Sequence, residues 1–64
     1  MGNFEVGKRR LEELVHRKFP GDVQNEALID SISDGGAAFG AIADMGDDEI
    51  EEMIEMERQF RSSR

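Results

Sequence analysis

The chain contains no cysteine, tryptophan or tyrosine, and Pro20 is its only proline. Without cysteine, neither a disulfide nor a thiolate zinc site can form, so a chain of 64 residues must gain its stability from helix packing or self-association. No apolar run is long enough for a signal peptide or a membrane span, which predicts a cytoplasmic protein that does not contact membranes. No alternating apolar–polar run indicates a β-strand either.

Basic side chains are scarce and unevenly placed. The net charge is -7, with net +2 over residues 1–20, -5 over residues 21–46 and -4 over residues 47–64. Nucleic-acid binding needs clustered Lys and Arg to neutralise phosphates, so this composition argues against a nucleic-acid partner. The charge favours a partner with a basic surface instead.

Four segments have the apolar periodicity of short α-helices, at about residues 4–18, 23–33, 37–45 and 48–61. The first, second and fourth have suitable N-terminal caps in Asn3, Asp22 and Asp47. The Asp34-Gly35-Gly36 stretch is expected to end the second helix. The sequence therefore predicts an all-α fold, with residues 1–64 as one small domain formed by a compact bundle of three to four short helices.

The expected apolar faces differ in width. The first helix has a narrow stripe that includes Gly7, whose lack of a side chain permits close approach of a neighbour. The third segment is apolar or small on nearly all sides, which predicts that residues 37–45 form the central, most buried helix. The remaining faces are expected to consist of Phe4, Leu11, Leu14, Val15 and Phe19 in the first helix, Val23, Ala27, Leu28, Ile29 and Ile32 in the second, and Ile50, Met53, Ile54, Met56 and Phe60 in the fourth.

No group of side chains indicates catalysis or metal binding. His16 is the only histidine, and it has no assignable nucleophile or second ligand, so we interpret it as a surface or boundary residue. The stretch that begins at Asp30 starts like a calcium loop, but Ile32 and Ala41 occupy its third and twelfth positions, where oxygen ligands are needed. We therefore expect no catalytic residue, no metal ligand and no cofactor.

Short motifs over about residues 11–46 carry a family resemblance. A Phe-Pro pair ends the first predicted helix and a Gly-x-x-x-x-Ala-Ile-x-x-Met motif runs through the third; the residues are Phe19, Pro20, Gly36, Ala41, Ile42 and Met45. This pattern resembles the ubiquitin-associated (UBA) and CUE superfamily of three-helix domains, although Lys18 and Gly46 stand where the family has a methionine and a second leucine. The resemblance implies a UBA/CUE-like core, followed by an extra acidic helix over about residues 47–61.

The first functional hypothesis is a non-catalytic protein–protein interaction module. Its partner would present an apolar patch rimmed by Lys and Arg, and the resemblance implies that this patch is that of ubiquitin. The expected contact residues are Phe19, Pro20, Ile42 and Met45.

Two alternatives stay open. A small acidic inhibitor or regulator, of the kind phages use, would occlude a basic site on a partner protein by electrostatics. Its contact residues would be Asp48, Glu51, Glu52 and Glu55. A structural homodimer would instead form through the apolar face of residues 50–60.

Overall fold

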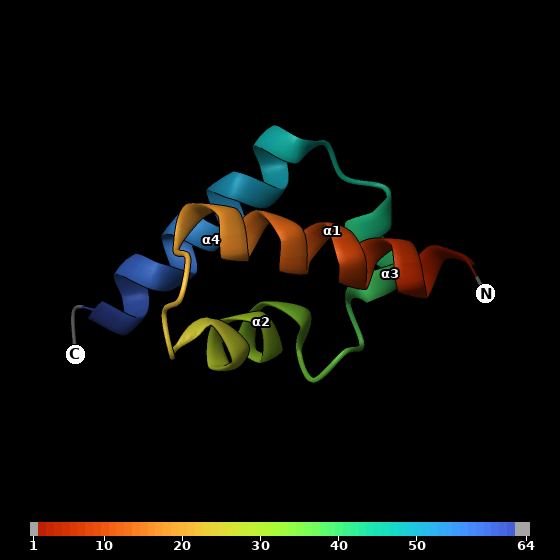
Figure 1. Ribbon diagram of the computed structural model, residues 1–64. Coiled ribbons are helices and arrows are strands. Elements are labelled where there is room, and N and C mark those ends of the chain that lie inside the picture. The colour runs from red at the N-terminus through yellow and green to blue at the C-terminus, as the bar shows by residue number, and fades with distance from the viewer. Residues whose placement is uncertain (1, 63–64) are drawn as a thin grey trace.

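A computed structural model describes residues 2–62, and this range forms four α-helices (Figure 1). They are α1 (Gly2–Lys18), α2 (Asn25–Ser33), α3 (Phe39–Ala43) and α4 (Asp47–Ser62). No strand occurs between residues 2 and 62, so the predicted all-α fold is confirmed for this part of the chain.

Helix α1 is the central element, because α2, α3 and α4 all pack against it (Figure 1). Helices α2 and α4 also contact each other, whereas α3 packs almost entirely on α1. The prediction that residues 37–45 form the central, most buried helix is wrong: only five residues are helical there, and Ala37 and Ala41 are exposed. Alanine and glycine offer too little apolar area to organise a core, and the longer α1 with its leucines takes that place.

Gly7 lies at a close contact between α1 and α3. A Cβ atom at this position would overlap the carbonyl oxygen of Phe39 and would stand 2.7 Å from its carbonyl carbon. The ring of Phe39 also meets the ring of Phe4 edge to face, with the centroids 5.1 Å apart. The close approach expected at Gly7 is therefore confirmed.

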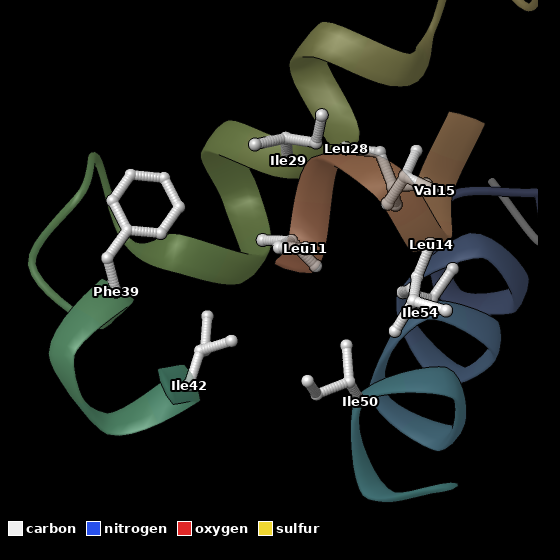
Figure 2. Packing of buried hydrophobic residues seen from close by; sticks show 9 residues of the cluster. All are labelled: Leu11, Leu14, Val15, Leu28, Ile29, Phe39, Ile42, Ile50 and Ile54. Carbon is white, nitrogen blue, oxygen red and sulfur yellow. The ribbon is translucent and has the colours of Figure 1, made fainter. Parts of the chain in front are cut away.

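One apolar cluster joins all four helices (Figure 2). Its buried members are Leu11, Leu14, Val15, Leu28, Ile29, Phe39, Ile42, Ile50 and Ile54. The predicted apolar faces are correct for these positions but too broad elsewhere. Val23 is 94% exposed, and Phe4, Met56 and Phe60 are at least half exposed.

The turn between α2 and α3 shortens the third helix. Asp34, Gly35 and Gly36 all have positive φ angles, of 55°, 69° and 105°. Glycine takes these angles without the steric penalty of a side chain. The turn continues through Ala37 and Ala38, whose N–H groups donate to the carbonyls of Asp34 and Ser33. The predicted end of the second helix is confirmed, but α3 then begins at Phe39 rather than at Ala37.

The predicted caps of α1 and α4 both lie inside their helices. Helix α1 begins at Gly2, so Asn3 lies within its first turn. Helix α4 begins at Asp47 itself. Gly46 holds the capping position, and Glu49 reaches back to accept a hydrogen bond from its backbone N–H at 3.2 Å, as in one half of a capping box.

Two ion pairs between α1 and α4 show in which direction α4 runs. Arg10 pairs with Asp47 at 2.6 Å and Lys18 pairs with Glu55 at 2.9 Å. Residues further along α1 therefore meet residues further along α4, so the two helices run in the same direction. Exposed pairs of this kind add little stability, and the side of α4 that faces the core is the one with the fully buried Ile50 and Ile54.

Candidate interaction surface

The Phe19-Pro20 elbow joins α1 to the turn before α2. The Arg58 guanidinium of α4 lies over the half-buried Phe19 ring, 4.1 Å from its centroid, and Arg58 Nη1 is 2.8 Å from Asp22 Oδ2. Asp22 Oδ1 accepts a hydrogen bond from Gln24 N at 2.8 Å, so it closes this turn instead of capping α2, which begins three residues later. The Gln24 N–H and the Arg58 guanidinium hold the pKa of Asp22 below its ordinary value. One face of Phe19 is thus covered by the protein's own arginine, and Pro20 remains exposed.

Asn25 fastens the start of α2 to the end of α1. It is buried, and its Nδ2 donates a hydrogen bond of 2.7 Å to the carbonyl oxygen of Phe19. The same Nδ2 lies 3.3 Å from His16 Nδ1, which accepts in the tautomer protonated at Nε2. His16 itself is exposed, in agreement with its interpretation as a surface or boundary residue.

Asn25→Ala is expected to destabilise the protein by about 1–2 kcal/mol, because the Phe19 carbonyl loses its shorter hydrogen bond and keeps only the one from the Asp22 N–H at 3.3 Å. The expected loss of stability is small because the substitution also removes Asn25 Oδ1, a buried oxygen that has no hydrogen-bond donor among residues 3–61. Urea unfolding of the variant measures the effect. The matched control is Gln24→Ala, an exposed neighbour that should change stability by less than about 0.5 kcal/mol. Equal stability of the two variants would show that this hydrogen bond does not hold the elbow.

The four residues predicted to bind a partner do not form one surface. Ile42 is 1% exposed and belongs to the core, so its side chain does not reach a partner in this conformation (Figure 2). Met45 is half-buried near Arg10, whose Nη1 donates a hydrogen bond of 3.0 Å to the Ala43 carbonyl. Phe19 lies nine residues further along α1 than Arg10, about 13 Å at 1.5 Å per residue. The short α3 packs on the first half of α1, which separates Met45 from the elbow.

The predicted acidic surface lies on the outer side of α4. We call Asp48, Glu51, Glu52 and Glu55 the acidic ridge. They occupy an arc of about 100° on the helix, away from the buried isoleucines. Asp48, Glu52 and Glu55 are exposed and Glu51 is half-buried. Glu55 accepts a hydrogen bond from Lys18, which raises the pKa of Lys18 above its ordinary value.

The predicted dimer face of α4 divides into two parts. Ile50 and Ile54 are fully buried in the chain's own core and are not available to a second copy. Met53 is half-buried, whereas Met56 and Phe60 are 68% and 64% exposed. At 100° per residue the second group points about 100° away from the first. Only the second group can take part in contacts with another molecule.

An apolar groove of about 370 Å³ runs between α2 and α4. Its apolar lining consists of Ile32, Met53, Met56 and Phe60, and we call it the α2–α4 groove. Ser31 Oγ donates a hydrogen bond of 2.6 Å to Glu57 Oε2, which links the two walls. All four apolar side chains fall within the predicted core faces, so the sequence did not indicate a groove here. The sequence feature that could have indicated the groove is the wide apolar arc of α4, because a single neighbouring helix covers only part of such an arc.

A larger and more polar cleft, of about 470 Å³, lies between α1 and α2. Its lining includes Glu12, His16, Glu26, Asp30 and Ser33. The Ser33 hydroxyl donates to the Asp30 carbonyl and accepts from the backbone N–H of Gly36, so it helps to end α2 rather than to face His16. Within the part of the chain that the structure describes, no group of three or more His, Asp or Glu side chains is arranged to hold a metal ion.

No protein-family model, curated protein or solved structure matches the chain. No helix within residues 2–62 has both the length and the apolar character needed to cross a membrane. Function is therefore inferred from the surface itself, on which the α2–α4 groove is an apolar concave feature.

Proposed function

We propose that the protein is a non-catalytic interaction module that binds a polypeptide through the α2–α4 groove. The observation that carries this proposal is the pair of exposed side chains Met56 and Phe60, which continue a half-buried apolar lining instead of joining the core. Apolar side chains gathered on one exposed face are typical of contact sites. Methionine is also well suited to such a site, because its flexible side chain adapts to different partners.

The partner chemistry expected from the sequence is retained, with different contact residues. Glu49 and Glu52 are exposed on α4 close to the groove. A partner whose apolar patch is rimmed by Lys and Arg would pair with these carboxylates while it covers the methionines. Ubiquitin is one probe of this kind, because CUE domains bind its apolar patch, and the UBA/CUE resemblance stays a prediction. We propose the cytoplasm as the compartment.

Met56→Gln is expected to weaken binding about tenfold or more, since burying a methionine side chain contributes roughly 1.5–3 kcal/mol. The substitution keeps the charge and the length of the side chain. The measurement is affinity capture from native cell extract on immobilised wild-type and variant protein, quantified by mass spectrometry. A ubiquitin titration followed by NMR runs in parallel.

The matched control is Val23→Gln, which makes the same kind of change at a side chain that is 94% exposed and outside the groove. Proteins retained by the wild type and by this control, but lost with Met56→Gln, would support the proposal. If no captured protein distinguishes the two variants, the groove is not the binding site. Ubiquitin-induced shifts confined to Phe19, Pro20 and Met45 would move the site to the surface expected from the family resemblance.

The acidic ridge supports a second candidate, an inhibitor or regulator that occludes a basic site. Three of its four carboxylates are exposed on one side of α4. In that case binding would fall steeply with salt, because exposed charges are screened within about 8–10 Å. Glu52→Gln would then weaken binding more than Met56→Gln, the reverse of the order expected for the groove.

A further inference from the structure

We propose that the α2–α4 groove takes one basic amphipathic α-helix as its ligand, an inference that rests on the proposed function. Met53, Met56 and Phe60 follow one another at spacings of three and four residues along α4. This is the spacing at which two helices interlock their side chains. The seam extends over about 10 Å, roughly two turns, and Ile32 of α2 forms the opposite wall.

The walls of the groove favour a helix over an extended peptide. Both walls are helices, so their interior backbone N–H and C=O groups already bond within α2 and α4. No strand edge exists between residues 2 and 62 to which an extended peptide could add. An extended ligand would have to leave its backbone groups unpaired against apolar side chains, whereas a helix satisfies its own.

The charges around the groove select a basic ligand. Residues 21–57, which contain all of α2 and most of α4, hold twelve acidic side chains and no Lys or Arg. Glu49 and Glu52 each lie one turn before a groove methionine and are exposed. Arg58, the first base that follows, is paired with Asp22, and Arg61 lies beside Glu57 and Phe60 at the C-terminal end of the groove. Lys and Arg on the flanks of the ligand helix would therefore meet Glu49 and Glu52, which form no ion pair within the described part of the chain.

The same charges disfavour a second copy of the chain as the occupant. A standard interface covers about 800 Å² of each partner, nearly a fifth of this molecule's 4366 Å² surface. An area of that size centred on Met56 takes in Glu49 and Glu52 from both copies. Self-association would bring together two chains of charge -7, with these acids inside or beside the contact.

The test uses synthetic leucine–lysine peptides as probes, each about four helical turns long. The first peptide places leucine at helical spacing on one face. The second has the same composition with leucine and lysine alternating, so that it forms no apolar helix face. The third keeps the helical spacing and carries glutamate in place of lysine. Each is titrated into the full chain, with NMR shifts at Met53 and Met56, circular dichroism of the bound peptide and the dissociation constant as readouts.

We expect the helical lysine peptide to gain helicity on binding, to shift Met53 and Met56, and to bind about tenfold or more tightly than the alternating peptide. Met56→Gln should remove most of this difference, Val23→Gln should leave it unchanged, and the glutamate peptide should not bind. Equal binding of the two lysine peptides, or binding insensitive to Met56→Gln, would mean that charge alone attracts them and would overturn the inference.

The inference and the proposed function can fail separately. If a captured protein depends on Met56 but the helical peptide does not bind, the groove is an interaction site for a surface other than a helix. If neither a captured protein nor the peptide depends on Met56, both proposals are wrong. Sedimentation of the free chain as a dimer that Met56→Gln converts to a monomer would identify a second copy as the occupant and overturn the helix ligand.

Discussion

Gly7→Ala is expected to destabilise the protein by about 2–3 kcal/mol, although alanine is the better helix former by about 1 kcal/mol. The added methyl group would overlap the Phe39 carbonyl oxygen and would approach the Ala43 nitrogen to 3.1 Å. Because these are backbone atoms, a change of rotamer cannot relieve the overlap, and α3 has to move away from α1. That movement also separates Phe39 from Phe4. Urea unfolding measures the loss, and the NMR shifts of the Phe39 ring report the displacement.

Gly40→Ala is the matched control, because it makes the same substitution one residue after Phe39. A Cβ atom there meets nothing within 4 Å, and Gly40 has a helical position within α3. The variant should gain up to about 1 kcal/mol from the higher helix propensity of alanine. Two identical substitutions with opposite signs would establish that contact between α1 and α3, and not helix propensity, controls the effect at Gly7. A stabilising Gly7→Ala would show that α3 does not dock as described.

The third helix shows which part of the fold could be predicted from the sequence. Its existence and the burial of Phe39 follow from local pattern alone. Its place in the bundle does not follow. A run of small residues is compatible with a central helix packed closely on several sides, and also with a short helix that packs against a single neighbour. The apolar surface area of the side chains distinguishes these two arrangements. Apart from Phe39 and Ile42 the helix contains alanine and glycine, which bury little apolar area. The turn before it also takes up Ala37 and Ala38, whose N–H groups donate to the carbonyls of Asp34 and Ser33.

The candidate site could be predicted only in part, for a related reason. The apolar character of Met53, Met56 and Phe60 is evident in the sequence, and so is their position on one side of α4. Apolar periodicity shows which side chains of a helix could be buried, but it does not show how much of that face a neighbouring helix covers. Ile50 and Ile54 join the core cluster, whereas the nine-residue α2 meets the sixteen-residue α4 at Ser31 and Glu57 and leaves Met56 and Phe60 more than half exposed. Ile42 was misassigned to the surface for the opposite reason, because α1 covers it.

Leu11→Ala is expected to destabilise the protein by about 3–4 kcal/mol, the largest effect of a single truncation that we predict. Leu11 is fully buried at the centre of α1, and its side chain lies between Ile29 of α2 and Ile42 of α3 (Figure 2). The substitution removes three buried carbon atoms and leaves a cavity that the surrounding helices cannot all close at once. A domain of this size has only a small stability margin, so the variant should be partly unfolded at 37 °C.

The distribution of the effect tests whether α1 is the centre of the bundle. If it is, Leu11→Ala should lower amide protection in α2, α3 and α4 together, because each helix packs on α1. Val23→Ala, at an exposed side chain of similar size, should change stability by less than about 0.5 kcal/mol and leave protection intact. Loss of protection confined to α1 and α3 would mean that α2 and α4 hold together without α1. The α2–α4 groove would then persist in a protein whose central helix had come loose, and its geometry would not depend on the core described above.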